Sequence, residues 1–115
     1  MGLIRILLAD DHEVVRAGYR RLLKNTQDIE VIAEVASGED AYSRYCELHP
    51  DVVVMDLTMP GMGGLEASRR ILAHDNSANI LVFSVHENEV MLNRALDLGV
   101  LGYISKRSAS QVMVE

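Results

Sequence analysis

The sequence contains a single cysteine, Cys46, among its 115 residues. One thiol cannot close a disulfide within the chain, so a disulfide framework is excluded, and so is a metal cluster held by several thiolates. The sequence also lacks a signal-peptide pattern and any apolar stretch near the roughly 18 residues that a membrane helix needs. We therefore expect a cytoplasmic protein that does not contact a membrane.

Positive charge is scarce as well. Lysine and arginine together number 11, whereas aspartate and glutamate number 17, which gives a formal net charge of −6. Proteins that hold nucleic acid through its phosphates need clustered positive charge. We therefore expect no direct nucleic-acid binding by this segment, although the charge says nothing about a partner domain.

The sequence does contain enough apolar residues, 49% of the total, to build the core of one domain. Short apolar runs recur along it, and each is too short to form a helix and long enough to form a buried strand. These runs cover residues 3–9, 29–35, 52–55 and 80–83, with a weaker run at 100–104. The sequence thus predicts five strands.

Segments with helical spacing of apolar residues separate these runs. Val15, Tyr19 and Leu22 form one such stripe. Strands that alternate with helices predict a parallel sheet with helices on both faces. Right-handed crossovers place the carboxyl end of every strand at the same edge, where such sheets bind their ligands. We expect the second strand to lie at a side of the sheet, away from the site.

The residues that follow the predicted strands are polar. The first strand ends at Asp10 and Asp11, the third at Asp56, the fourth at Ser84, and the fifth leads to Lys106. Each of these residues alone would more often be a helix cap, a turn former or a surface charge. Their common position at one edge of the sheet favours a functional site.

Three crowded carboxylates repel one another unless a cation neutralises them. Oxygen ligands favour a hard ion, and a site that keeps some water suits Mg²⁺. A lysine and a hydroxyl beside the metal can hold phosphoryl oxygens. Asp56 lies on an expected central strand and is the best candidate for a carboxylate nucleophile that forms an acyl phosphate, whereas Asp10 and Asp11 form a metal-binding pair.

The motifs "LLADDHEVVRAG", "DVVVMDLTMPGMGGLEA", "LVFSVHE" and "GYISK" resemble the receiver domain of two-component response regulators. The resemblance covers essentially the whole chain and is nearest to the NarL/FixJ-type subgroup, whose members usually carry a LuxR-type helix-turn-helix output domain. It implies an α/β, three-layer, doubly wound, five-stranded parallel sheet of flavodoxin-like (receiver) topology, with strand order 2-1-3-4-5. We expect residues 1–115 to form one receiver domain, with a shortened last helix over 108–115 and an output domain absent from this chain.

The resemblance also implies roles for individual residues. Asp56 would accept a phosphoryl group from a sensor histidine kinase. Asp11, Asp56 and the backbone carbonyl of Thr58 would bind Mg²⁺, and Asp10 would act largely through a water molecule. Lys106 would pair with the acyl phosphate.

A conformational switch is implied by the same resemblance. Ser84 would hydrogen-bond a phosphoryl oxygen, and Tyr103 would turn inward as this hydroxyl moves. The chain would be a phosphoacceptor rather than a turnover enzyme. It would control a DNA-binding domain, with a homodimer as a possible assembly, or act as a stand-alone receiver in protein contacts or a phosphorelay.

Two other classes of protein are less consistent with the sequence. A phosphatase with an aspartyl nucleophile would need a second carboxylate two residues after Asp56, where this chain has Thr58. A flavodoxin-like cofactor binder would need a phosphate-cradling loop after the first strand. The acidic stretch "DDHE" occupies that place and repels phosphate unless a metal is bound.

Overall fold

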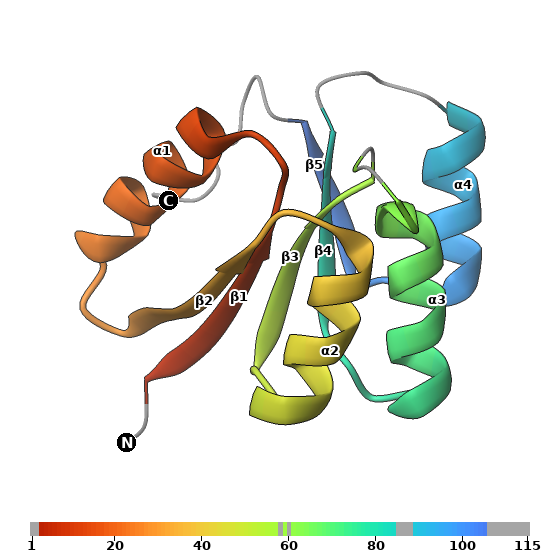
Figure 1. Cartoon of the computed structure of the whole chain (residues 1–115), viewed down its shortest axis with the longest axis horizontal. Helices are drawn as coiled ribbons and strands as arrows, with labels where there is room; N and C mark the ends of the chain where they lie inside the picture. Colours follow the sequence, from red (N-terminus) through yellow and green to blue (C-terminus); the bar gives the residue numbers. More distant parts are fainter. Residues whose placement is uncertain (1–2, 58, 60, 85–88, 106–115) are drawn as a thin grey trace.

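A computed structural model of the chain describes residues 3–57, 59, 61–84 and 89–105. Five parallel strands form one sheet in the order β2-β1-β3-β4-β5 (Figure 1). The strands are β1 (Ile4–Ala9), β2 (Ile29–Val35), β3 (Val52–Asp56), β4 (Ile80–Ser84) and β5 (Gly102–Ser105). This arrangement confirms the predicted α/β fold, its strand order and the outer position of β2.

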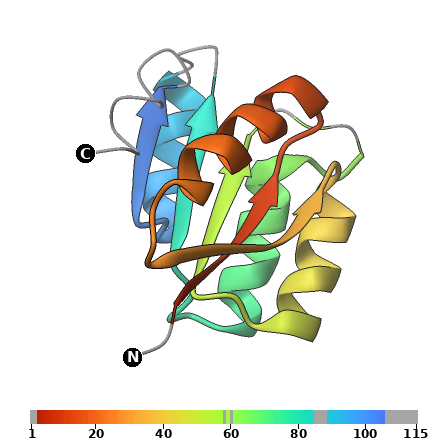
Figure 2. The ribbon, with the colours of Figure 1, turned by 90° about the vertical axis from the view of Figure 1, so that its left-hand side faces the viewer.

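Helices cover both faces of the sheet and make three layers (Figure 2). The helices are α1 (Glu13–Lys24), α2 (Gly38–Leu48), α3 (Gly63–His74) and α4 (Glu89–Leu98). Helix α1 lies on one face, and α2, α3 and α4 lie side by side on the other (Figures 1 and 2). Residues 108–115, where a shortened last helix was expected, lie outside the described residues.

The apolar core is divided by the sheet into two clusters. In β1, Ile6 and Leu8 face α1 and pack with Tyr19 and Phe83. Leu7 and the other alternate residues of β1 and β3 belong to the larger cluster under α2, α3 and α4. Because successive side chains of a strand point to opposite faces, this division confirms that the central strands are buried on both sides.

The sequence misplaced a few details of these elements. Strand β1 begins at Ile4 rather than at residue 3, and β5 covers Gly102–Ser105 rather than 100–104. In α1 the buried residues are Tyr19 and Leu23, whereas Leu22 is only half-buried. Residues three and four positions after Tyr19 are both leucines and both lie near its face of the helix, so spacing alone could not separate them.

Close backbone contacts lock α3 against the end of β3. A Cβ atom on Gly64 would stand 1.9 Å from the carbonyl oxygen of Asp56, and one on Gly38 would stand 2.5 Å from the carbonyl oxygen of Gly63. The amide of Gly64 also donates a hydrogen bond to the carbonyl of Leu57 (3.1 Å). Glycine is therefore required at both contacts, which fix the backbone that carries Asp56.

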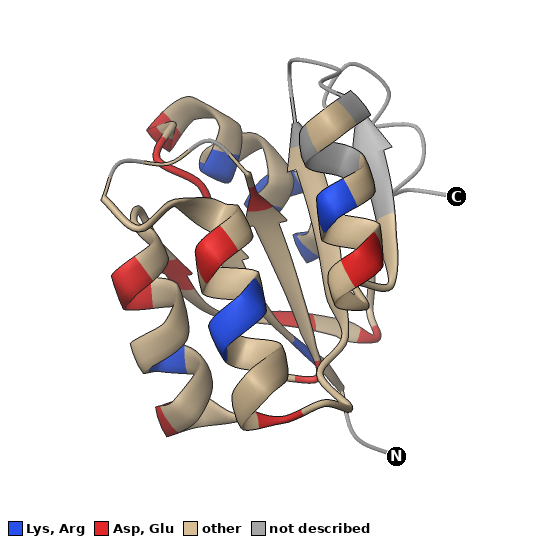
Figure 3. Cartoon of the chain, turned by 90° about the vertical axis from the view of Figure 1, so that its right-hand side faces the viewer, with Lys and Arg blue, Asp and Glu red and all other residues tan. Residues whose placement is uncertain are grey.

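The outer faces of α2, α3 and α4 carry charges of both signs (Figure 3). Glu66 accepts hydrogen bonds from Arg69 and Arg70 on the same helix, and these bonds lower the pKa of its carboxyl to about 2. Within the described ranges, no helix is long and apolar enough to cross a membrane.

Candidate functional site

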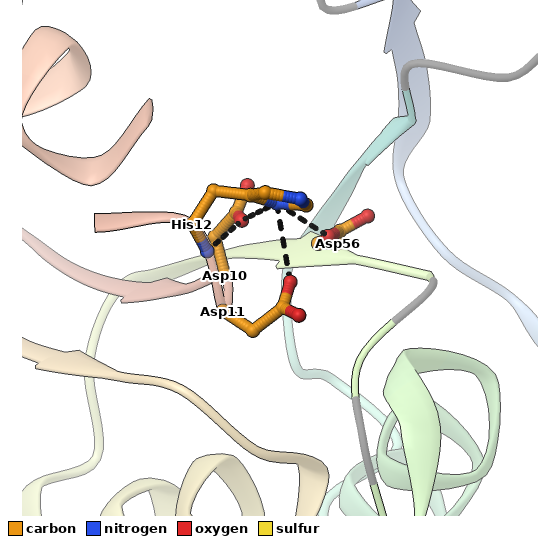
Figure 4. A group of neighbouring side chains, drawn as sticks. All are labelled: Asp10, Asp11, His12 and Asp56. Carbon is orange, nitrogen blue, oxygen red and sulfur yellow. Dashed lines mark hydrogen bonds and ion pairs between the residues drawn. The ribbon is translucent and has the colours of Figure 1, made fainter. Parts of the chain in front are cut away.

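Four side chains meet at the carboxyl edge of the sheet, three from consecutive residues after β1 and one from the end of β3 (Figure 4). Asp10 and Asp11 follow β1, His12 is the N-cap residue of α1, and Asp56 is the last residue of β3. Strands β1 and β3 are hydrogen-bonded neighbours, so their carboxyl ends lie side by side. One ligand atom from each of the four residues lies within 4.8 Å of the others. The structure therefore brings the three predicted carboxylates together.

The three carboxylates differ in exposure. The side chains of Asp10 and Asp56 are 5% and 1% exposed, whereas the Asp11 side chain is 32% exposed. Burial removes water from a carboxylate and destabilises its charged form unless cations or hydrogen-bond donors compensate. The group thus has two enclosed carboxylates and one that opens to solvent, which suits the capture of a cation.

His12 contacts all three carboxylates of this group, although no pattern in the sequence predicts a role for it. Its Nδ1 atom is 2.9 Å from Asp10 Oδ1, 3.1 Å from Asp11 Oδ1 and 4.0 Å from Asp56 Oδ2. The available signal was its position directly after Asp11, in the turn that enters α1. The direction of the ring, which decides its importance, is a tertiary feature.

The backbone at Asp10 is held by several contacts. The amide of His12 donates to Asp10 Oδ1 (2.8 Å), and the amide of Asp10 donates to the carbonyl of Val35 (3.0 Å). The guanidinium of Arg16 donates to the carbonyl of Asp10 and lies 3.4 Å from Glu34. Arg16 thus connects α1, β2 and the site loop.

The comparisons with known proteins agree with this geometry. A family model for the response regulator receiver domain matches residues 6–115. The chain belongs to the response regulator receiver family. It is thus a phosphoacceptor domain of two-component signalling rather than a turnover enzyme.

Individual relatives of this receiver are response regulators or parts of them. The response regulator UvrY of Escherichia coli K12 is 42% identical over 97% of this chain and 51% of its own length. A LuxR-family two-component response regulator from Aurantimonas is 44% identical, with a TM-score of 0.91 over 98% of this chain and 81% of its own. The isolated receiver domain of RcsB from Salmonella enterica serovar Typhimurium, solved with the phosphomimetic BeF₃⁻, is 27% identical, with a TM-score of 0.88 over 97% of this chain and 83% of its own. The receiver spans about half the length of the curated relatives that it matches.

The other predicted residues of this receiver are placed in part. Ser84 is the last residue of β4, which is the neighbour of β3, and it is aligned with Ser105 of β5. Tyr103 lies on β5, one strand further from β3, and is aligned with Val82 of β4. The structure describes their strands but not their side chains. Thr58 and Lys106 lie outside the described residues.

The segment that follows β3 in the receiver is anchored by α2. The carboxylate of Glu39 accepts a hydrogen bond from the amide of Met62 (3.0 Å), and this bond is the main cause that lowers the pKa of Glu39. A Cβ atom on Gly61 would stand 2.7 Å from the same carboxylate. Helix α2 thus contacts Gly61 and Met62, directly before α3.

The electrostatic field of the site reaches α1. Burial of the Tyr19 hydroxyl raises its pKa far above the ordinary value, and the negative charges of Asp10 and Asp56 raise it further. The ring of Tyr19 packs on Phe83, with ring centroids 5.0 Å apart. Phe83 is aligned with Asp56 in the neighbouring strand. The aromatic pair therefore forms an apolar surface beside Asp56.

Proposed function

We propose that Asp56 is the residue of this receiver that accepts the phosphoryl group, in a reaction that depends on Mg²⁺. The observation that carries this proposal is the meeting of Asp10, Asp11 and Asp56 at one edge of the sheet, with ligand atoms within 4.8 Å. Asp56 ends the central strand and is held in place by the close contact with Gly64. With 1% of its surface exposed, it is also the most deeply buried of the three carboxylates.

The donor set fits a hard divalent cation, because carboxylate oxygens are the ligands that Mg²⁺ prefers. Asp11 and Asp56 would bind the ion directly, together with the backbone carbonyl of Thr58, and Asp10 would act largely through a water molecule. When bound, Mg²⁺ neutralises the carboxylates and the transferred phosphoryl oxygens. The partial exposure of Asp11 gives the ion its route to the site.

The chemical step is a phosphoryl transfer from the histidine of a sensor kinase. A carboxylate oxygen of Asp56 forms a bond to phosphorus, the nitrogen–phosphorus bond breaks, and the imidazole nitrogen leaves with its electron pair. Lys106 pairs with the acyl phosphate, and Ser84 donates a hydrogen bond to one of its oxygens. Movement of Ser84 and Tyr103 then changes the surface that the receiver presents to its partners.

The partners follow from the relatives. Regulators such as UvrY are about twice as long as this chain, and the Aurantimonas relative is a LuxR-family protein. We infer that the receiver acts in the cytoplasm, is phosphorylated by a sensor histidine kinase, and controls a C-terminal DNA-binding domain of a longer protein. A homodimer of phosphorylated receivers is the assembly that we expect.

Intact-mass spectrometry after incubation with acetyl phosphate and Mg²⁺ tests this proposal. The wild-type receiver gains the mass of one phosphoryl group, and the gain disappears in Asp56→Ala and after addition of EDTA. Asp51→Asn is the matched control, because Asp51 lies at the opposite edge of the sheet, where it accepts a hydrogen bond from the amide of Arg5 (2.8 Å). Phosphorylation of Asp56→Ala to the wild-type level would overturn the proposal.

A further inference from the structure

His12 is in contact with the proposed metal site, although that site is complete with oxygen ligands alone. Its Nδ1 atom is 2.9 Å and 3.1 Å from oxygens of Asp10 and Asp11, and 4.0 Å from an oxygen of Asp56 (Figure 4). Ligand atoms that surround one small divalent ion at about 2.1 Å stand roughly 3 Å apart when adjacent and roughly 4 Å apart when opposite. The nitrogen thus has the spacing of a fourth ligand.

We propose that His12 Nδ1 is a metal ligand that makes this site selective for borderline transition metals over Mg²⁺. The proposal rests on the metal site of the proposed function and adds a nitrogen to it. Imidazole nitrogen binds Co²⁺, Ni²⁺ and Zn²⁺ well, whereas Mg²⁺ prefers oxygen and keeps its water. Mg²⁺ therefore uses the carboxylates alone, and transition metals use the carboxylates and His12.

The backbone around His12 supports this role. The amide of His12 donates to Asp10 Oδ1, which fixes the turn and directs the ring over the carboxylates. The side chain forms no capping hydrogen bond with α1, although His12 is the N-cap residue. Replacement of the ring removes the hydrogen bond between His12 Nδ1 and Asp10 Oδ1 (2.9 Å), but it keeps the backbone hydrogen bond and removes no cap. The backbone of the variant can therefore be compared with that of the wild type.

Metal affinities of the wild type and His12→Ala test the proposal, measured by isothermal titration calorimetry with Mg²⁺, Mn²⁺ and Ni²⁺. We expect His12→Ala to weaken Ni²⁺ binding at least about tenfold, to weaken Mn²⁺ binding less, and to change Mg²⁺ binding less than about twofold. A general disturbance of the site would weaken all three ions alike. Equal Ni²⁺ affinity of wild type and variant, or an equal loss for all three ions, would overturn the proposal.

A spectroscopic measurement identifies the ligand itself. Electron paramagnetic resonance of bound Cu²⁺ should show nitrogen hyperfine coupling in the wild type and lose it in His12→Ala. His74→Ala is the matched control for adventitious binding to an exposed imidazole, since His74 lies at the end of α3. Coupling that persists in His12→Ala and disappears in His74→Ala would assign the nitrogen elsewhere and refute the proposal.

The two proposals fail in different ways. The role of His12 alone would be refuted if Asp56 is phosphorylated normally with Mg²⁺ while Ni²⁺ binds equally well to the wild type and to His12→Ala. Absence of any Mg²⁺-dependent phosphorylation, combined with Ni²⁺ binding that requires His12, would refute the proposed function and support the nitrogen ligand.

Discussion

The carboxylates at the two edges of the sheet differ in their neighbours. At the amino edge, Asp51 accepts a hydrogen bond from the amide of Arg5 (2.8 Å), and Asp75 accepts from the hydroxyl of Tyr45 (2.8 Å) and from the amide of Ser77 (3.0 Å). At the carboxyl edge, three carboxylates converge on the imidazole of His12. At the amino edge the carboxylates lie apart and each accepts hydrogen bonds from its own donors, whereas at the carboxyl edge the carboxylates lie together.

The carboxylates at the two edges therefore affect the stability of the folded protein in opposite directions. Carboxylates that accept hydrogen bonds from neutral donors contribute to the folded state directly. Like charges held within a few ångströms oppose folding, and such an arrangement persists where a bound cation repays its cost. The amino edge therefore has the features of a structural contact, and the carboxyl edge has the features of the cation-binding site that we propose.

The largest effect is expected from Gly64→Ala. The three atoms nearest to the added Cβ would be backbone atoms of Asp56 and Leu57, at 1.9 to 2.8 Å, so the end of β3 or the start of α3 must move. We expect a loss of at least about 3 kcal/mol in the free energy of unfolding, measured by urea denaturation.

Gly18→Ala is the matched control for that experiment. Gly18 lies inside α1, exposed, and a Cβ there would meet nothing within 4 Å. Alanine should stabilise this helix by up to about 1 kcal/mol. Equal losses in the two variants would mean that the contact between α3 and β3 is loose and does not position Asp56.

A second prediction concerns stabilisation by metal. Mg²⁺ at ten times its dissociation constant should raise the free energy of unfolding by about 1.4 kcal/mol. Asp11→Asn should abolish this gain, and Asp51→Asn should keep it, because only Asp11 belongs to the carboxyl-edge group. Thermal unfolding with and without Mg²⁺ measures the gain. Equal Mg²⁺ responses of the two variants would contradict the distinction between the edges.

The smallest effect is expected from Tyr45→Phe at the amino edge. The variant loses the hydrogen bond to Asp75 and should lose about 1 kcal/mol of stability, while its Mg²⁺ affinity stays at the wild-type value. Burial and, after it, the hydrogen bond to Asp75 raise the pKa of Tyr45 to about 12. Hydrogen bonds from Ser77 and, after them, from Tyr45 lower the pKa of Asp75 below its ordinary 3.8.

The pH dependence of the contact between Tyr45 and Asp75 follows from the raised pKa of Tyr45 and the lowered pKa of Asp75. The lowered pKa of Asp75 gives stability that is present above its unfolded pKa and is lost as the pH falls through the folded value. The raised pKa of Tyr45 gives stability that is present below its unfolded pKa of 10.0 and is lost as the pH rises toward about 12. The stability difference between wild type and Tyr45→Phe should be largest between about pH 5 and pH 9. A difference that is constant from acid to alkali would show that the loss is not in this hydrogen bond.

The sequence predicted the sheet and the acidic group because both follow from short-range patterns. Apolar runs of strand length fixed the strands, and parallel topology then placed Asp10, Asp11 and Asp56 at one edge. The orientation of His12 and the bridge from Arg16 to the Asp10 carbonyl depend on how α1 enters the fold. Their spacing in the chain is that of an ordinary turn and an ordinary helix surface, so no local pattern distinguished them.

The central claim is that a divalent cation binds at the carboxyl edge and nowhere near the amino edge. The most direct test is the broadening of backbone amide signals in the NMR spectrum of the receiver by a trace of Mn²⁺, because broadening falls steeply with distance from the ion. The strands separate the two edges by about 17 Å, and so the amides of Asp11, His12 and Leu57 should broaden first, while those of Asp51 and Ser77 stay sharp. Broadening that begins at Asp51 and Ser77, or that is uniform across the spectrum, would contradict the claim.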